Sequence, residues 1–262
     1  MGTNPLFRFT GLGTTALLFF AYLYVPIVIL IVLSFNANRT ATIWTGFSLD
    51  WYGRVLRNDD IIGAAQNSLI VASAATAVAT VAATMAALGM NRARFRGQDA
   101  VQGLLALPLV VPEIVTAVAT LLFFVIVGIQ LGLTSLIIAH TVFCIPFAYL
   151  PIRARLEGMD PLLEEAASDL YAPPWAAFRR ITLPLLWPGI LSGAMLAFII
   201  SLDDFVISYF VAGAGSTTLP VYIFGMIRIG ITPEVNAASS LMLVVSILFV
   251  SLAWLVGRAR SG

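Results

Sequence analysis

The sequence predicts an all-α membrane protein with about six transmembrane helices. The first observation is composition: 60% of the 262 residues are hydrophobic, only 10% are charged, and the mean hydropathy is +0.98. Because soluble domains carry about 25% charged residues, most of this surface is expected to contact lipid. The second observation is that the apolar residues gather in segments of about 20 residues or more, the length of helix that crosses a bilayer core.

Six apolar segments are each long enough to cross the bilayer, and we assign them all to a single transmembrane domain over residues 1–262. The first has an apolar core too long for a signal peptide, and no small-x-small cleavage site follows it. The expected spans are Thr14 to Phe35, Ile61 to Met90, Val101 to Gly128, Thr134 to Ile152, Leu185 to Ala212, and Glu234 to Val256.

The basic residues predict the orientation of these spans. All 14 are Arg, and with both termini in the cytoplasm ten of them lie inside. This excess fits the positive-inside rule. The run Arg92, Arg94 and Arg96 contributes most, and we expect it to anchor the chain in the inner leaflet. The four on the outer side are Arg39, Arg54, Arg57 and Arg228.

Residues that the chain lacks exclude several kinds of chemistry. Without Lys it cannot form a P-loop, so ATP and its Mg²⁺ would have to be bound by another chain. The single Cys144 and single His140 exclude an internal disulfide and a His/Cys metal cluster, and both lie in an apolar run that favours buried positions. The sequence has no basic block with interleaved aromatics, so nucleic-acid binding is not expected. No catalytic set is apparent, so we expect no enzymatic activity, no metal and no cofactor in this chain.

The longest cytoplasmic connection is expected between the fourth and fifth spans, over about residues 153–184. A short helix is predicted there, with Asp160 as its N-cap and Pro161 at its first position. Glu164 and Glu165 fall in the first turn, where the helix dipole favours carboxylates.

The rest of this loop suits a docking surface. Ala166 and Ala167 leave a flat face for the close approach of a partner, and the run 172–174, Ala-Pro-Pro, ends the helix. A second, amphipathic helix is expected from Trp175, with Pro184 at the entry to the fifth span. An ordinary solvated loop would explain the same pattern, because short motifs are permissive.

The loop resembles the EAA loop of ABC-importer permeases. The E-A-A of that pattern is Glu165, Ala166 and Ala167, and its I-x-L-P ends on Leu183 and Pro184. Other segments resemble the second permease of spermidine/putrescine importers. They are 22–26 running into 34–36, 94–97, 201–204 and 232–237.

The resemblance implies a type I ABC importer permease fold in a bacterial inner membrane, with Glu164 and the EAA loop forming a coupling helix on an ATPase. It also implies the partners: a second permease, an ATPase dimer and a periplasmic substrate-binding protein.

Tyr171 departs from this pattern, because the family has Gly at that position. If that Gly adopts a positive φ, Tyr171 would be strained by roughly 1 kcal/mol or more. The alternatives are a turn built differently, through Pro173 and Pro174, or a turn that does not need this angle.

Three carboxylates lie inside predicted spans, namely Glu113, Asp203 and Asp204. Because a charge near the bilayer centre costs at least about 2.5–3.5 kcal/mol, such residues usually face a cavity or a partner. With Trp51 and Tyr209 they could pass a polyamine through Coulomb attraction and cation–π contacts, so we expect these five residues along a substrate path.

Three alternatives remain open at this stage. Asp203 or Asp204 could instead form a structural ion pair with Arg228 or with an Arg of a partner. The whole chain could also be a proton-coupled secondary transporter that uses Glu113 and Asp203 as relay carboxylates, although no inverted repeat is evident. Polyamines are the favoured substrates, and other cationic or zwitterionic compounds, such as choline-like compounds or opines, remain open because fold resemblance does not fix the substrate.

Overall fold

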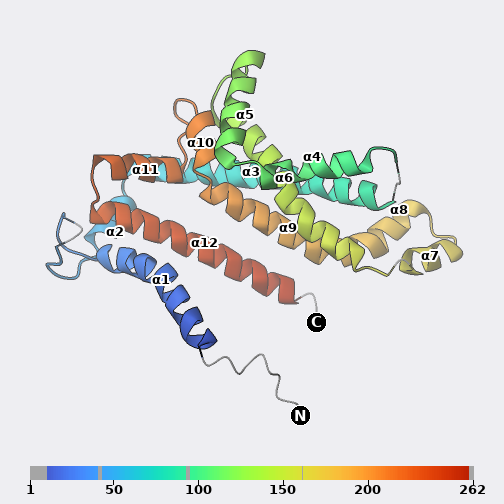
Figure 1. The fold of residues 1–262 in the computed structure, drawn as a ribbon, viewed down its shortest axis with the longest axis horizontal. Coiled ribbons are helices and arrows are strands. Elements are labelled where there is room, and N and C mark those ends of the chain that lie inside the picture. Colours follow the sequence, from blue (N-terminus) through green and yellow to red (C-terminus); the bar gives the residue numbers. More distant parts are fainter. Residues whose placement is uncertain (1–10, 41–42, 93–94, 161, 260–262) are drawn as a thin grey trace, which may run out of the picture. The chain divides into compact units, whose positions relative to one another are not determined.

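The computed structural model describes residues 11–40, 43–92, 95–160 and 162–259. The described residues form helices and loops, with one isolated β-bridge between Asn36 and Phe47. The helices, labelled in Figure 1, are α1 (Leu12–Leu33), α2 (Asp50–Val55), α3 (Asp59–Arg92), α4 (Gln98–Val110), α5 (Glu113–Val127), α6 (Leu133–Glu157), α7 (Leu162–Asp169), α8 (Pro174–Ala177), the π-helical η2 (Phe178–Thr182), α9 (Leu183–Asp203), α10 (Val206–Val211), α11 (Leu219–Ile229) and α12 (Pro233–Ala259).

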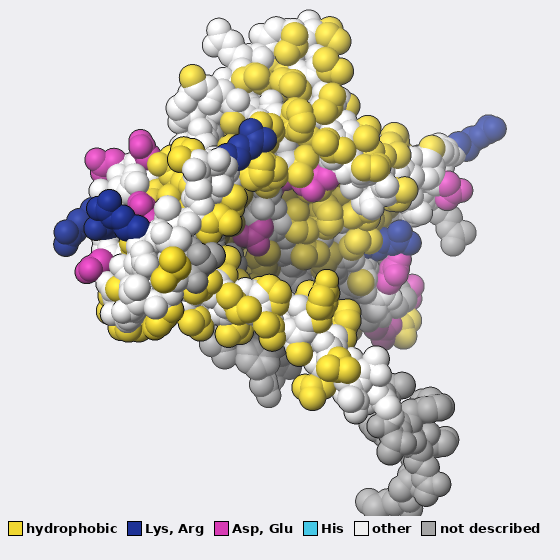
Figure 2. All heavy atoms as spheres, turned by 60° about the vertical axis from the view of Figure 1, so that its left-hand side comes forward, with side chains coloured by type: hydrophobic (Ala, Val, Ile, Leu, Met, Phe, Trp, Pro, Cys, Tyr) yellow, Lys and Arg dark blue, Asp and Glu magenta, His cyan; other side chains and the backbone are white. Residues whose placement is uncertain are grey.

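The expected membrane spans are largely confirmed. Five described helices are long and apolar enough to cross a bilayer, and α4 with α5 makes a sixth if the bent pair counts as one. Hydrophobic side chains predominate on the face shown in Figure 2, as a lipid-facing surface requires. None of the most apolar stretch of α1 is buried within the chain.

Two predicted spans are interrupted, which corrects the sequence prediction. The third breaks at Val111 and Pro112, where α4 and α5 meet at 109°. Val111 precedes a proline and is therefore pushed out of the helical region, to ψ 133°. The fifth ends at Asp203, because Asp204 is extended and its carboxylate accepts the backbone N–H of Ser208 at 2.8 Å.

The chain divides into two compact units, residues 1–61 with 223–244 and residues 62–222 with 245–262. In the first unit, Asn36 organises the loop after α1. Its side-chain amide donates to the carbonyl oxygen of Ile43 at 2.8 Å, and its oxygen accepts the backbone N–H of Thr45 at 3.1 Å. The short helix α2, which the sequence analysis did not predict, packs Trp51 and Val55 inward.

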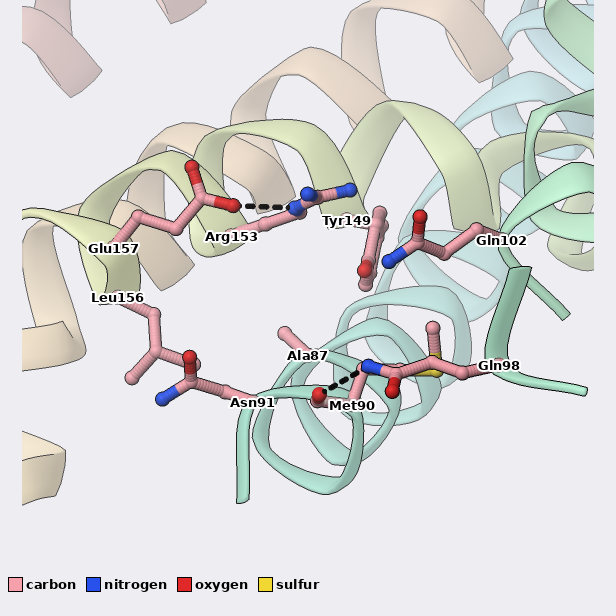
Figure 3. A pocket seen from close by; sticks show the side chains of 9 residues that line it. All are labelled: Ala87, Met90, Asn91, Gln98, Gln102, Tyr149, Arg153, Leu156 and Glu157. Carbon is pink, nitrogen blue, oxygen red and sulfur yellow. Dashed lines mark hydrogen bonds and ion pairs between the residues drawn. The ribbon is translucent and has the colours of Figure 1, made fainter. Parts of the chain in front are cut away.

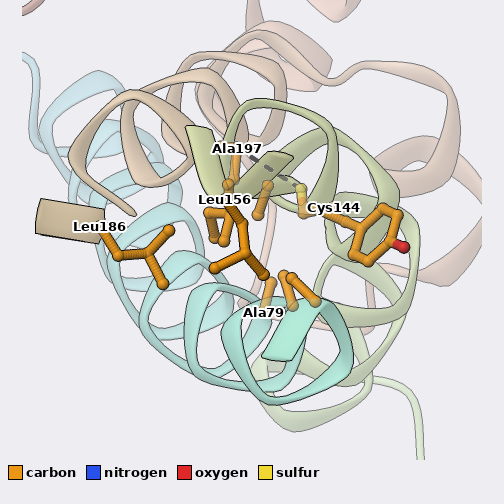
Figure 4. Packing of buried hydrophobic residues seen from close by; sticks show 10 residues of the cluster. Ala79, Cys144, Leu156, Leu186 and Ala197 are labelled. Atoms are coloured by element: carbon orange, nitrogen blue, oxygen red, sulfur yellow. Dashed lines mark hydrogen bonds between the residues drawn. The ribbon is translucent and has the colours of Figure 1, made fainter. Parts of the chain in front are cut away.

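The core of the second unit is the contact of α6 with α9, which lie side by side in Figure 1. Small residues let the backbones approach closely, as is common between helices in membranes. A Cβ on Gly193 would lie 2.5 Å from the carbonyl oxygen of Ala148. Cys144 is buried in the same cluster, as predicted, with its Sγ 3.5 Å from the carbonyl oxygen of Ala197 (Figure 4).

Candidate functional site

The loop helix α7 begins as the sequence predicts. The carboxylate of Asp160 accepts the backbone N–H of Leu162 at 3.0 Å, which is the role of an N-cap. Glu164 and Glu165 lie in the first turn. Pro161, expected at the first helical position, lies outside the described residues.

Tyr171 ends α7 with a left-handed backbone. The N–H of Tyr171 donates to the carbonyl of Ser168 at 2.9 Å, and the N–H of Ala172 to that of Ala167 at 3.0 Å. This pair of bonds is a Schellman motif, whose left-handed position Gly usually fills. Tyr171 has φ 58° and is the one non-glycine residue with positive φ in the described part of the chain. The angle is therefore kept without the glycine, at a cost of about 1–2 kcal/mol.

Thr182 fixes α7 against the next helix, a contact that the sequence analysis missed. Its hydroxyl donates to the carboxylate of Glu164 at 2.5 Å, and the side chain is fully buried in the π-helical turn η2. Such π-helical turns occur frequently at functional sites. The signal in the sequence was a lone Thr inside the I-x-L-P element, between Ile181 and Leu183.

The two alanines of the loop face different ways. Ala167 is buried within this chain, whereas Glu165 and Ala166 are exposed. The expected flat face of two alanines is therefore reduced to Ala166. The predicted second helix does not stop at Pro184 either, because the helical backbone continues from Pro174 through η2 to Asp203.

The second group of predicted site residues meets where α9 breaks. Asp204 is only 7% exposed. Its Oδ1 lies 3.4 Å from Nε2 of His140, and its Oδ2 is buried without a hydrogen-bond partner. Glu113, the first residue of α5, lies close enough to Asp204 and His140 for their charges to interact. The structure thus brings together two of the three predicted carboxylates.

His140 sits between two serines that the sequence analysis did not identify. Its Nδ1 lies 2.8 Å from Oγ of Ser201, and its Nε2 lies 3.1 Å from Oγ of Ser208. The expectation that His140 is a buried, satisfied histidine is confirmed. The sequence carried no clear signal for this cluster, because Ser201 and Ser208 lie on opposite sides of the helix break at Asp204.

The remaining predicted path residues lie elsewhere. Asp203 is exposed, and the hydroxyl of Ser246 donates to it at 3.4 Å. Tyr209 is exposed to 43%. Trp51 belongs to the first unit, where its indole N–H donates to the carbonyl oxygen of Asn36 at 2.8 Å. The guanidinium carbon of Arg54 lies 4.6 Å from the centre of the Trp51 ring, so one ring face is already covered.

Arg228, the ion-pair partner considered for Asp203 or Asp204, lies over the ring of Phe224 at 4.6 Å. Among the described residues, Asp204 makes an ionic contact with His140, and Glu113 forms no ion pair with an Arg. The membrane carboxylates are therefore left without a permanent counter-cation from the described residues.

A polar pocket of about 320 Å³ lies between the ends of α3, α4 and α6. Figure 3 shows the ion pair between Arg153 and Glu157, at 2.7 Å, on its upper rim and the amides of Asn91, Gln98 and Gln102 around it. The amide of Gln98 donates to the carbonyl oxygen of Met90 at 2.8 Å, which ties the start of α4 to the end of α3.

The comparisons with known proteins agree on one family. Residues 79–261 match the family described as binding-protein-dependent transport system inner membrane component. The chain is 45% identical over 242 residues to the spermidine/putrescine transport system permease protein PotC of Haemophilus influenzae, covering 92% of this chain and 94% of that protein. It is 39% identical over 268 residues to the putrescine transport system permease protein PotI of Escherichia coli, covering 99% and 95%.

Solved structures share the fold. A bacterial ABC transporter involved in the import of the acidic polysaccharide alginate aligns with a TM-score of 0.74 at 18% identity, covering 97% of this chain and 96% of that one. The MetNI methionine ABC transporter aligns with a TM-score of 0.65 at 20% identity, covering 82% and 99%. The predicted type I ABC importer permease fold is therefore confirmed.

These relatives are transport components rather than enzymes, as the sequence predicts. With the apolar helices, they place the chain in the inner membrane as a multi-pass protein. A stand-alone proton-coupled transporter, the alternative considered from the sequence, finds no support among them. The chain belongs to the family of inner membrane components of binding-protein-dependent transport systems.

Proposed function

We propose that this chain is one of two permease subunits of an ATP-driven importer for polyamines such as spermidine and putrescine. The observation that carries the substrate class is the meeting of Glu113 with the buried Asp204, without an Arg partner in the described residues. Two ionised carboxylates at the breaks of membrane-spanning segments are costly unless a cation neutralises them. A polyamine supplies that cation, and the relatives are named for spermidine and putrescine transport.

The other components of the importer act around this chain. A second permease completes the path, an ATPase dimer binds ATP and Mg²⁺, and a periplasmic binding protein delivers the ligand. Both termini lie in the cytoplasm, which the excess of Arg on that side supports. This orientation places α7 at the cytoplasmic face.

The exposed part of α7, with Glu165 and Ala166, contacts the ATPase, while Glu164 holds the helix to the chain through Thr182. Closure of the ATPase dimer moves α7, and the two permeases alternate between inward-open and outward-open states. Asp203 and Tyr209, which are exposed in the same unit, extend the path beyond Asp204. Trp51, which belongs to the first unit, stays a prediction from the sequence alone.

Uptake of labelled putrescine and spermidine, in cells that lack this chain, tests the proposal. Wild type should restore uptake, whereas Glu165→Arg and Asp204→Asn should each lower it at least tenfold. Asp59→Asn, at an exposed carboxylate in the first turn of α3, is the matched control and should leave uptake unchanged. Restored uptake of a choline-like compound alone would discard the polyamine assignment, and full uptake with Glu165→Arg would refute the coupling role of α7.

A further inference from the structure

The end of α7 combines a strained backbone with an almost fully exposed aromatic ring. Tyr171 adopts φ 58°, a conformation that glycine adopts freely and that other residues rarely take. Its side chain is 96% exposed, so packing within this chain does not offset the strain. An observed backbone outlier of this kind points to a function for the residue that occupies it.

Tyr171 is part of an exposed apolar cluster, which we define as Leu170, Tyr171 and Trp175. Leu170 is 82% exposed and Trp175 is 69% exposed. The ring of Trp175 is supported from behind by Phe178, with 5.5 Å between ring centres. Tyrosine and tryptophan dominate binding energies at protein interfaces, because they bury a large area with few rotatable bonds.

The charge around the cluster favours a soluble protein over the bilayer as the surface that the cluster contacts. Segment 160–180 carries the four carboxylates of Asp160, Glu164, Glu165 and Asp169 against two guanidinium groups, Arg179 and Arg180, which gives a net charge of −2. The anionic inner leaflet repels such a segment. An apolar groove on a soluble protein accepts the cluster without that repulsion.

We propose that Tyr171 is the anchor of this cluster, inserting its ring into an apolar groove of the ATPase subunit and helping to select which ATPase this permease accepts. The inference rests on the proposed function, in which α7 contacts the ATPase. It adds that the ring at position 171 is retained for binding despite its backbone strain. The glycine of related loops relieves the strain and forgoes the anchor.

The test measures two properties of the assembled permease pair in nanodiscs: the Kd for the ATPase and the thermal stability without it. Tyr171→Gly should weaken ATPase binding at least tenfold while leaving the thermal midpoint unchanged or higher. Tyr171→Asn, which tolerates left-handed φ but lacks the ring, should bind as weakly as Tyr171→Gly. Tyr171→Phe keeps the ring and should bind within about threefold of wild type.

Equal Kd values for all three variants would overturn the inference. If Glu165→Arg also leaves binding intact, the proposed contact of α7 has failed instead. The bilayer is tested with Tyr171→Cys carrying a polarity-sensitive dye, and the native Cys144 is fully buried and should not take up the dye. A dye signal that is already apolar in nanodiscs without ATPase would assign the cluster to lipid and contradict the proposal.

Discussion

At the scale of single residues, His140 connects the buried polar groups. One imidazole ring reaches Ser201, Ser208 and Asp204 within 3.4 Å. The burial of His140 could be predicted from its apolar neighbours. Its partners could not, because Ser201 and Ser208 lie on opposite sides of a helix break that hydropathy does not reveal. The family glycine raised a positive φ at Tyr171 as one of the open possibilities, and the structure decides for it. The exposure of the Tyr171 ring could not be predicted from the sequence.

Replacing His140 by Ala should impair both stability and transport. The change leaves the hydroxyls of Ser201 and Ser208 buried without this partner, at about 1–3 kcal/mol for each unsatisfied group, and Oδ1 of Asp204 keeps only the backbone N–H of Ser208. We expect a lower thermal midpoint of the solubilised permease pair and a higher KM for spermidine uptake. His140→Gln can restore one of the bonds and should recover part of both values. Wild-type KM in His140→Ala would show that the ring does not orient Asp204.

At the scale of single helices, the structure differs from the sequence prediction in where the spans break rather than in how many spans there are. Hydropathy identifies apolar length, so it joined α4 to α5 and α9 to α10. The breaks depend on backbone chemistry at single residues, Pro112 in one case and Asp204 in the other. Helices α2 and α11 were not predicted, because each is shorter than a span.

Gly193→Ala should separate α6 from α9. The added methyl would lie 2.5 Å from the carbonyl oxygen of Ala148, and a backbone atom cannot move aside without shifting its helix. We expect a loss of about 1–3 kcal/mol, the range for overpacking a core, measured by chemical denaturation in detergent. Gly103→Ala in α4 is the matched control, because nothing lies within 4 Å of its added Cβ. Equal stability of the two variants would contradict close packing at Gly193.

Thr182→Val should loosen α7 without disturbing the volume of the buried site. It removes the hydroxyl that donates to Glu164, and bonds to charged groups contribute about 1.5–3 kcal/mol. We expect faster amide hydrogen exchange over α7 and uptake reduced severalfold. Thr182→Ser keeps the hydroxyl and should retain slow exchange. If α7 exchanges at the wild-type rate in Thr182→Val, other contacts hold it.

Orientation in the membrane is the property of the whole molecule that composition predicts best. It depends on the sum of all Arg residues and is insensitive to the position of any single helix. The run at Arg94 that contributes most lies partly outside the described residues, so the prediction stands on the sequence. The two compact units, by contrast, could not be predicted, because they arise from tertiary contacts that hydropathy does not encode.

Cysteine labelling in intact cells should confirm this orientation. Ser168→Cys on α7 should react with a membrane-impermeant maleimide only after the membrane is opened. Asn38→Cys, in the loop after α1, should react from outside. Ser168 is exposed and Asn38 is partly exposed, and the buried Cys144 gives a low background. Reversed labelling would invert the proposed topology and place α7 out of reach of an ATPase.

Helix α9 begins directly after Thr182 and ends directly before Asp204. Its 21 residues make a rod about 30 Å long. A helix is stiff along its axis, so a displacement imposed at its first turn would arrive at its last turn almost undiminished. A movement that the ATPase imposes on α7 would then change the distance from Asp204 to Glu113. The affinity of these two carboxylates for a cation would change with that distance.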